Sequence, residues 1–185
     1  MDENNPPPTN ETAEALPRRG PADRLLLLVG SLGYLGFVPV ASGTVAVAVV
    51  GIPLYLLMAI VLTPSWPAYV VAVILFTLGA VYVAQQADRI LDEKDSKKNV
   101  IDELPGYLFS LVGLPVTWQL VAAAFFIERA IDIAKIWPAN WIERKLPGGW
   151  GVVLDDVVAG LYTLGILRAG LWLAPAWFGV EAAGG

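Results

Sequence analysis

The 185-residue sequence contains neither cysteine nor histidine. Without cysteine the chain has no disulfide framework, no thiolate zinc site and no cysteine nucleophile. Without histidine it has no phosphohistidine intermediate, no histidine acid–base pair and no histidine-ligated metal centre. Any hydrolytic chemistry must therefore use Asp, Glu, Lys, Arg and hydroxyl side chains.

Charge is also scarce, since 16% of the residues are charged and 56% are hydrophobic, with a mean hydropathy of +0.61. This composition predicts a membrane protein. The net charge of −5 leaves no basic stripe that could follow a phosphate backbone, so no nucleic-acid partner is expected. Beyond Leu25, most charges fall into a first island, Asp88–Glu103, and a second island, Glu128–Asp156.

The first 23 residues are rich in Pro, Asn and acidic side chains and have too little apolar surface to offset the entropy of ordering. They are predicted to form a disordered tail that precedes a membrane-embedded domain over residues 24–185. The tail does not have the pattern of a cleaved signal peptide. Its basic residues Arg18 and Arg19, with Arg24, favour a cytoplasmic N-terminus.

The apolar runs predict an all-α, polytopic integral membrane helical bundle. Leu25–Val40 is broken by glycines and a proline and is shorter than the roughly 20 residues of a span, so a re-entrant or interfacial segment is expected. Three spans are predicted, at Val45–Leu62, Ala68–Ala87 and Val152–Leu167. The Trp-rich stretch Trp172–Phe178 suits the far interface.

The run Leu104–Ile127 lies between the two charged islands and determines whether they share a membrane face. Its 24 residues suffice for one crossing but not for two. However, Gly113-Leu114-Pro115 interrupts the run, because Pro disfavours helix in the residue before it. We therefore predict a short helical hairpin with arms Asn99–Leu114 and Thr117–Lys135, which places both islands on the cytoplasmic side.

This hairpin would bring the carboxylates of the two islands to one depth. They are Asp102, Glu103, Asp132, Asp155 and Asp156, with Arg129 and Lys135 among them. Carboxylates held this close repel unless a cation lies between them, and Mg²⁺ favours such oxygen ligands. The alternative is a set of interhelical salt bridges and solvated helix ends; the duplicated acidic pairs favour a metal site.

Two smaller patterns leave alternatives open. Gly43 and Thr44 precede an apolar helix, where free backbone N–H groups can bind a phosphate or where the motif is only a helix cap. Gly106 and Ser110 form a small-xxx-small pair that can pack helices within the chain or between copies in a homo-oligomer.

The string ERAIDIAKIWPANWIERKLPGGWGVVLDDVVAG, residues 128–160, resembles the bacterial phosphatidylglycerophosphatase A family. The family pattern has Arg, Asp-Ile-x-Lys, Trp-Pro, Gly-Gly-x-Gly and Asp-Asp-x-x-Ala-Gly in this order. Val100-Ile101-Asp102-Glu103 with Gly106, and Gly43-Thr44, resemble its upstream motifs. Ile136 departs from a usual Pro, and Ala46 from a frequent Gly, but no carboxylate is lost.

The resemblance implies a Mg²⁺-dependent phosphatase of the bacterial cytoplasmic (inner) membrane. Its substrate would be phosphatidylglycerol phosphate among the membrane lipids, and its product phosphatidylglycerol. The five carboxylates would hold the metal and supply a base or a nucleophile. Gly43, Thr44, Arg129 and Lys135 would bind the phosphate, at a site facing the cytoplasm.

Two other functions compete with this interpretation. A phosphatase for another lipid or isoprenoid phosphate would use the same carboxylates. A small cation transporter would also contain intramembrane Asp and Glu, but along a pore rather than at helix ends.

Overall fold

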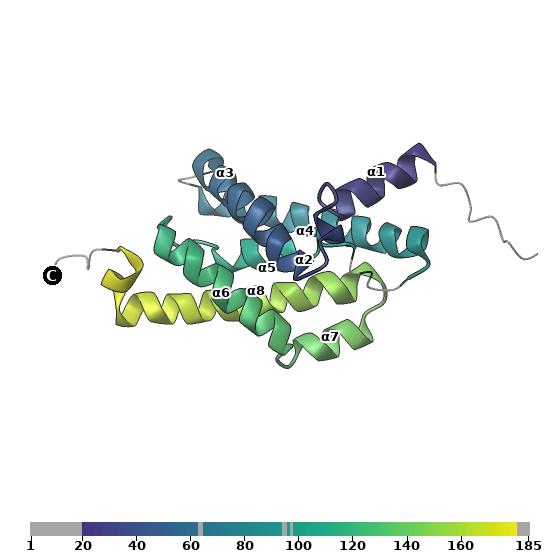
Figure 1. The fold of residues 1–185 in the computed structure, drawn as a ribbon. Helices are drawn as coiled ribbons and strands as arrows, with labels where there is room; N and C mark the ends of the chain where they lie inside the picture. The colour runs from purple at the N-terminus through teal and green to yellow at the C-terminus, as the bar shows by residue number, and fades with distance from the viewer. Residues whose placement is uncertain (1–19, 63–64, 94–95, 97, 181–185) are drawn as a thin grey trace, which may run out of the picture.

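The computed structural model describes residues 20–62, 65–93, 96 and 98–180, and within these residues every regular element is helical. In chain order the elements are α1 (Pro21–Gly30), η1 (Leu35–Phe37), α2 (Ser42–Ala46), η2 (Val47–Gly51), α3 (Ile52–Leu62), α4 (Trp66–Leu91), α5 (Glu103–Ser110), α6 (Trp118–Ala134), α7 (Ala139–Lys145), α8 (Gly149–Leu173) and η3 (Pro175–Phe178) (Figure 1). The all-α prediction is confirmed.

Within the described residues, three helical stretches are long and apolar enough to cross a membrane. They are Ser42–Leu62, which comprises α2, η2 and α3, and the helices α4 and α8. They contain 21, 26 and 25 residues, at or above the roughly 20 that a span needs. Large apolar side chains such as Ile60, 78% exposed, and Leu75, 64% exposed, cover their outer surfaces, as expected for helices that face lipid. The three predicted spans lie within these helices.

The N-terminal segment does not form a span. Helix α1 ends at Gly30, and the chain then reverses through Leu32, Gly33 and Tyr34, all with positive φ. The break within Leu25–Val40 agrees with the expected re-entrant or interfacial segment. Helix α1 begins at Pro21, so it includes the last three residues of the predicted tail; residues 1–19 lie outside the described part of the chain.

The first arm of the predicted hairpin is shorter than expected. Helix α5 has eight residues and rises about 12 Å, which is too little to cross much of a bilayer, so the prediction of a helix over Asn99–Leu114 is wrong at both ends. Its late start has a physical cause. The backbone N–H groups of Val100 and Ile101 donate to the Gly30 carbonyl at 2.9 and 3.1 Å and bind this segment to α1 instead of extending the helix.

The second arm agrees with the prediction of Thr117–Lys135 to within one residue at each end. Helix α6 begins after Thr117, whose side-chain oxygen accepts a hydrogen bond from the Leu120 N–H at 3.2 Å. It ends at Ala134, and the next residue, Lys135, has a left-handed backbone with φ 44°. The chain between α5 and α6 contains Gly113, at φ 63°, and Pro115, so the predicted break is confirmed.

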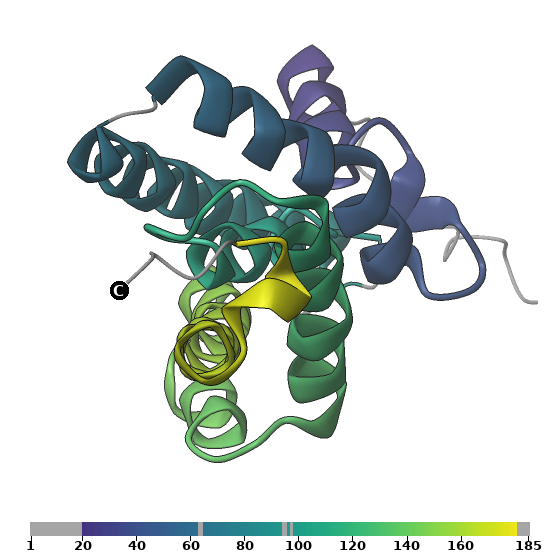
Figure 2. The ribbon, with the colours of Figure 1, turned by 90° about the vertical axis from the view of Figure 1, so that its left-hand side faces the viewer.

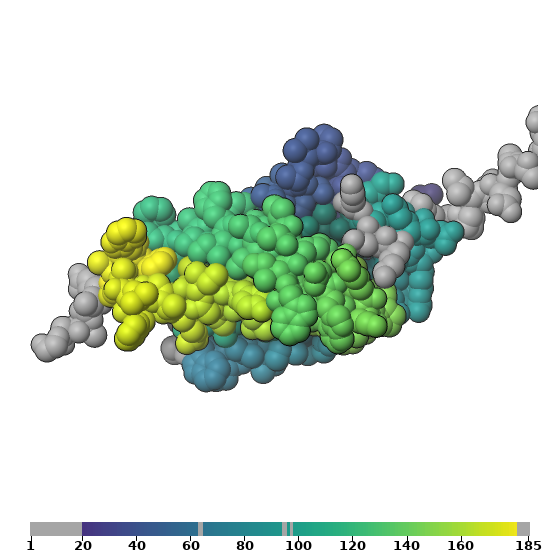
Figure 3. Space-filling view, turned by 90° about the horizontal axis from the view of Figure 1, so that it is seen from below, coloured from purple at the N-terminus to yellow at the C-terminus, as the bar shows by residue number. Residues whose placement is uncertain are grey.

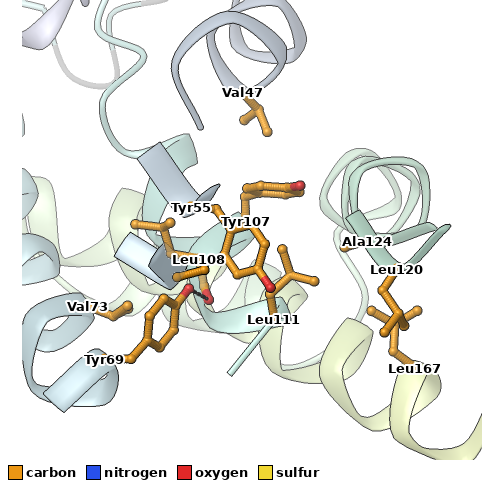
Figure 4. Close-up of a cluster of buried hydrophobic side chains, with 11 residues drawn as sticks. Val47, Tyr55, Tyr69, Val73, Tyr107, Leu108, Leu111, Leu120, Ala124 and Leu167 are labelled. Carbon is orange, nitrogen blue, oxygen red and sulfur yellow. Dashed lines mark hydrogen bonds between the residues drawn. The ribbon is translucent and has the colours of Figure 1, made fainter. Parts of the chain in front are cut away.

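Three buried tyrosines join the spans to the hairpin (Figure 4). The ring of Tyr55 packs edge-to-face against Tyr69 and Tyr107, with centroid distances of 6.1 and 6.4 Å. The Tyr69 hydroxyl donates to the Leu108 carbonyl at 2.8 Å, and the Tyr107 hydroxyl donates to the Val121 carbonyl at 3.2 Å. These contacts fix α5 between the spans and α6.

Helix α8 is central to the fold, because it contacts α4, α5, α6 and α7. The view along it shows α6 at its side and α3 and α4 on the other side of the molecule (Figure 2), and α6, α7 and α8 together form much of one face (Figure 3). Helices α5 and α8 cross closely, since a Cβ atom on Gly160 would meet the Gly106 backbone. Gly106 therefore packs within the chain.

Candidate active site

The charged islands meet beside a cavity of ≈ 520 Å³. The start of α2, the segment before α5, the start of α5 and the end of α6 contribute its walls. Its polar and glycine lining includes Ser42, Gly43, Thr44, Asn99, Asp102, Glu103, Arg129 and Asp132. Arg129 of the second island forms an ion pair with Glu103 of the first, as the hairpin prediction requires.

Three of the five predicted carboxylates form a group that we call the carboxylate triad: Glu103, Asp132 and Asp156. One oxygen from each lies within 4.8 Å of the others. Asp156 is buried, and the other two are half-buried. Ionised carboxylates so close together repel unless a cation compensates them, and carboxylate oxygens are ligands for hard divalent cations. The triad is therefore suited to a metal ion.

Arg129 supplies a positive charge beside the triad. Its guanidinium forms a bidentate pair with Glu128, in which Nε and Nη2 each donate at 2.7 Å. Its Nη1 pairs with Glu103 and lies 3.4 Å from Asp132. One guanidinium thus pairs with several carboxylates and can neutralise the charge of only one of them. The site keeps an excess of negative charge, which a divalent cation would reduce.

Glu128 is a site residue that the sequence analysis did not assign. Its side chain is fully buried at the base of the cluster, and it fixes the plane and direction of the Arg129 guanidinium. A glycine makes room for it, because a Cβ atom on Gly106 would lie 2.7 Å from Glu128 Oε1. An acidic residue within an apolar helix was the available signal, since such a charge is costly without a partner.

Asp155 has different partners from its neighbour Asp156. Lys135 Nζ lies 3.2 Å from Asp155 Oδ2 and 2.8 Å from Glu143 Oε2. Partial burial lowers the pKa of Lys135, but its hydrogen bonds and ion pairs with Glu143 and Asp155 raise the pKa above its ordinary value. Asp155 Oδ1 also accepts the backbone N–H of Asp156 at 3.0 Å. Asp155, Lys135 and Glu143 form what we call the lysine cluster.

Asp102 lies in the cavity wall immediately before α5 and is 5% exposed. It is outside the carboxylate triad, which takes its neighbour Glu103. Each of the two acidic pairs in the sequence is thus divided, with one member in the triad and the other beside it.

The Gly43-Thr44 motif lies opposite Glu103. A Cβ atom on Gly43 would overlap the Glu103 carboxylate, so a larger residue here would displace the Glu103 side chain. Ser42 begins the helix, after Ala41 at φ 50°. Both Gly43 and Thr44 line the cavity, as a phosphate-binding role would require.

The chain is similar to proteins of known family. Residues 28–171 match the family model described as phosphatidylglycerophosphatase A. The phosphatidylglycerophosphatase A of Escherichia coli (strain K12) is 36% identical over 133 residues, which cover 71% of this chain and 75% of that protein. That of Haemophilus influenzae is 30% identical over 146 residues, covering 78% and 86%.

A Bacteroides thetaiotaomicron protein with the provisional name phosphatidylinositol-3-phosphatase is 29% identical over 144 residues, covering 76% of this chain and 88% of that protein. No solved structure matches the chain.

Proposed function

Because the chain belongs to the phosphatidylglycerophosphatase A family, we propose that it hydrolyses phosphatidylglycerol phosphate to phosphatidylglycerol and inorganic phosphate. The observation that carries the proposal is the carboxylate triad beside a cavity that also contains an arginine and the Gly43-Thr44 motif. This arrangement combines metal ligands with anion-binding groups, which is what phosphoryl transfer needs.

We propose Mg²⁺ as the metal and Glu103, Asp132 and Asp156 as the residues that hold it. Bound there, Mg²⁺ supplies positive charge and a Lewis acid for the phosphoryl oxygens. Arg129 Nη1 and the backbone N–H groups of Gly43 and Thr44 bind the oxygens that do not react. These contacts orient the phosphorus toward water in the cavity.

Asp102 is the carboxylate that we propose as the general base, since it lines the cavity but lies outside the triad. Water adds to the phosphorus while the bond between phosphorus and the glycerol oxygen breaks. Asp102 accepts the proton of that water, and the departing glycerol oxygen takes up a proton from solvent, which gives phosphatidylglycerol and inorganic phosphate. In this mechanism Lys135 is a positioning residue that orients Asp155, because its amine is held between Asp155 and Glu143.

We propose that the site faces the cytoplasm at the bacterial inner membrane. The basic residues before and within α1 and those of the two islands support this orientation. Trp137, 71% exposed, and Trp141, 54% exposed, follow Lys135 closely in the chain and suit a membrane interface. The acyl chains of the substrate would then stay in lipid while its headgroup enters the cavity.

Single cysteines test this orientation, since the chain has none of its own. Cysteines at Lys98 and Arg144, both exposed, should react with an impermeant thiol reagent from the same side of sealed vesicles. A cysteine at Trp177, at the opposite end of α8, should react from the other side. Labelling of the first two from opposite sides would contradict the proposed topology.

Hydrolysis of another lipid phosphate is the main alternative, and the provisional name of the Bacteroides relative is an observation that favours it. A cation path is less consistent with the structure, because the triad forms one compact group, with its oxygens within 4.8 Å of one another, instead of a series of charges along the spans. The decisive experiment is phosphate release by purified protein from phosphatidylglycerol phosphate, phosphatidic acid and an isoprenoid phosphate, with Mg²⁺ and with excess EDTA. Equal rates with EDTA would contradict metal assistance; a preference for another lipid would reassign the substrate.

A further inference from the structure

The lining of the ≈ 520 Å³ cavity differs between its buried and its exposed parts. Its charged residues are buried or half-buried, and they are Asp102, Glu103, Arg129 and Asp132. Among the described lining residues, those that are exposed are all apolar, and they are Pro39, Ala41 and Ile133. We call these three residues the apolar mouth. A ligand that enters the cavity therefore passes exposed apolar side chains before it reaches the charges.

Ile133 links the apolar mouth to an exposed face of α6. It is 76% exposed, and Phe126, which is 68% exposed, lies seven residues earlier on the same helix. Seven residues are about two helical turns, so the two side chains point within about 20° of each other and lie about 10 Å apart along the axis. Ala130, which is also exposed, lies between them in the chain. We call Phe126, Ala130 and Ile133 the α6 stripe.

The α6 stripe adjoins the acidic site and extends away from it. Arg129, which pairs with Glu103, lies four residues before Ile133, and residues four apart on a helix are neighbours. The 17 residues of α6 rise about 25 Å, close to the roughly 30 Å thickness of the hydrocarbon core. With the site at the cytoplasmic face, Ile133 lies near the membrane interface and Phe126 lies deeper. The stripe then leads from the cavity into the lipid.

We propose that the apolar mouth and the α6 stripe bind the diacylglycerol part of the substrate, which enters the cavity laterally from the bilayer. This inference rests on the proposed function. With the terminal phosphate in the cavity, the acylated end of the lipid lies at Ile133, and one acyl chain follows the stripe toward Phe126. Ile133 is then a specificity-determining residue, which favours lipid phosphates over water-soluble phosphomonoesters. A second copy of the chain is a poorer occupant of the stripe, because it would also cover the apolar mouth.

The test compares phosphatidylglycerol phosphate with its deacylated analogue, which keeps the headgroup and both phosphates but has no acyl chains. The proteins are the wild type, Ile133→Asn, the conservative Ile133→Leu and the control Ile60→Asn. Ile60 is 78% exposed but lies near the end of α3, roughly 24 Å along the helices from Thr44 in the cavity wall. The measured quantity is the ratio of kcat/KM for the lipid to that for the analogue, in the same mixed micelles.

Ile133→Asn should lower this ratio about tenfold, because the amide loses its water when an acyl chain covers it and gains no new partner. Ile133→Leu and Ile60→Asn should keep the ratio within about twofold of the wild type. An unchanged ratio in Ile133→Asn, or an equal fall in Ile60→Asn, would overturn the proposal. Light scattering that shows Ile133→Asn to convert a dimer to a monomer would also overturn it, since a second copy would then cover the stripe. If the wild type releases no phosphate from phosphatidylglycerol phosphate, the proposed function itself fails.

A protection experiment decides the proposal if the wild type does not hydrolyse the deacylated analogue. Ile133→Cys, Phe126→Cys and Ile60→Cys each provide a single thiol, because the chain has no cysteine. The probe is a non-hydrolysable phosphonate analogue of phosphatidylglycerol phosphate. At about ten times its Kd, the probe should slow alkylation of Ile133→Cys and Phe126→Cys about tenfold and leave Ile60→Cys unchanged. A probe that inhibits phosphate release but does not slow alkylation at either α6 position would contradict the proposal and leave the proposed function intact.

Discussion

Asp155 and Asp156 are adjacent in the chain, but they belong to two charge clusters of different character. Asp156 belongs to the carboxylate triad, next to the buried guanidinium of Arg129. Asp155 belongs to the lysine cluster, in which the side chain of Lys135 is 43% exposed. Successive residues on a helix point about 100° apart, so neighbouring carboxylates can face different partners. An acidic pair in a sequence is therefore not evidence that both members do the same chemistry.

The two clusters also differ in the free energy that would be lost if the basic side chain of each were removed. Removing a partner from a buried ion pair costs about 3–5 kcal/mol, because it leaves an uncompensated charge. Exposed pairs contribute about 0–1 kcal/mol. The ion pairs of Arg129 are buried, whereas those of Lys135 are closer to exposed pairs. Substitutions in the triad should therefore have the larger effects.

Asp156→Asn should have the largest effect. It removes a charged ligand of the proposed metal with little change in shape, so kcat should fall about 10³-fold or more. We expect Mg²⁺ to raise the melting temperature of the wild type but not that of the variant, because a ligand stabilises only the protein that binds it. Phosphate release and thermal melting with and without Mg²⁺ measure both effects.

Asp155→Asn is the matched control for that substitution, and its kcat should fall about tenfold or less while stabilisation by Mg²⁺ is retained. Equal losses in the two variants would remove the distinction between the clusters.

Gly43→Ala should come next, with a fall in kcat/KM of about 10²-fold. The added Cβ atom would overlap the Glu103 carboxylate and displace a triad residue, and small misplacements of reacting groups are costly. Gly79→Ala is the control, because a Cβ atom there meets nothing within 4 Å. Activity assays of both variants provide the comparison; full activity in Gly43→Ala would show that the close approach of α2 to α5 is unimportant.

A smaller effect is expected within the lysine cluster. Lys135→Met and Asp155→Asn should each lower kcat about tenfold, and the double variant should be little worse than either, since both remove the same ion pair. Additive losses, measured as log kcat, would indicate that Lys135 acts directly on substrate instead of through Asp155.

The smallest effect is expected at the tyrosine contacts of Figure 4, where Tyr69 packs among apolar side chains. Tyr69→Phe removes the hydrogen bond from the hydroxyl to the Leu108 carbonyl, which keeps the Leu111 N–H as a partner at 3.4 Å, and should destabilise the protein by about 0.5–1.5 kcal/mol. Melting temperature should fall while kcat stays within about twofold of the wild type. A large loss of kcat without a loss of stability would link this region to the chemistry.

Much of the fold was predictable from local sequence. Long apolar runs determine the three spans, because a polar backbone in lipid must satisfy its hydrogen bonds within a helix. Gly113 and Pro115 determine the break before α6, and Thr117 its cap. The length of α5 was not predictable, because Val100 and Ile101 donate their backbone hydrogen bonds to α1, which lies some 70 residues earlier in the chain.

The same division holds for the site. The sequence by itself determined that Asp and Glu must carry any metal chemistry, since it has neither histidine nor cysteine. The expectation that the acidic pairs begin helices holds for Glu103, but Asp155 and Asp156 lie about two turns inside α8. Only the tertiary structure decided that Glu103, Asp132 and Asp156 form the triad while Lys135 pairs with Asp155. The physical reason is that partner choice depends on helix rotation and on the distance between helices. Here the crossing of α5 and α8 at Gly106 and Gly160 sets both. The small-xxx-small pattern at Gly106 indicates that a helix can pack there, but not which helix does so.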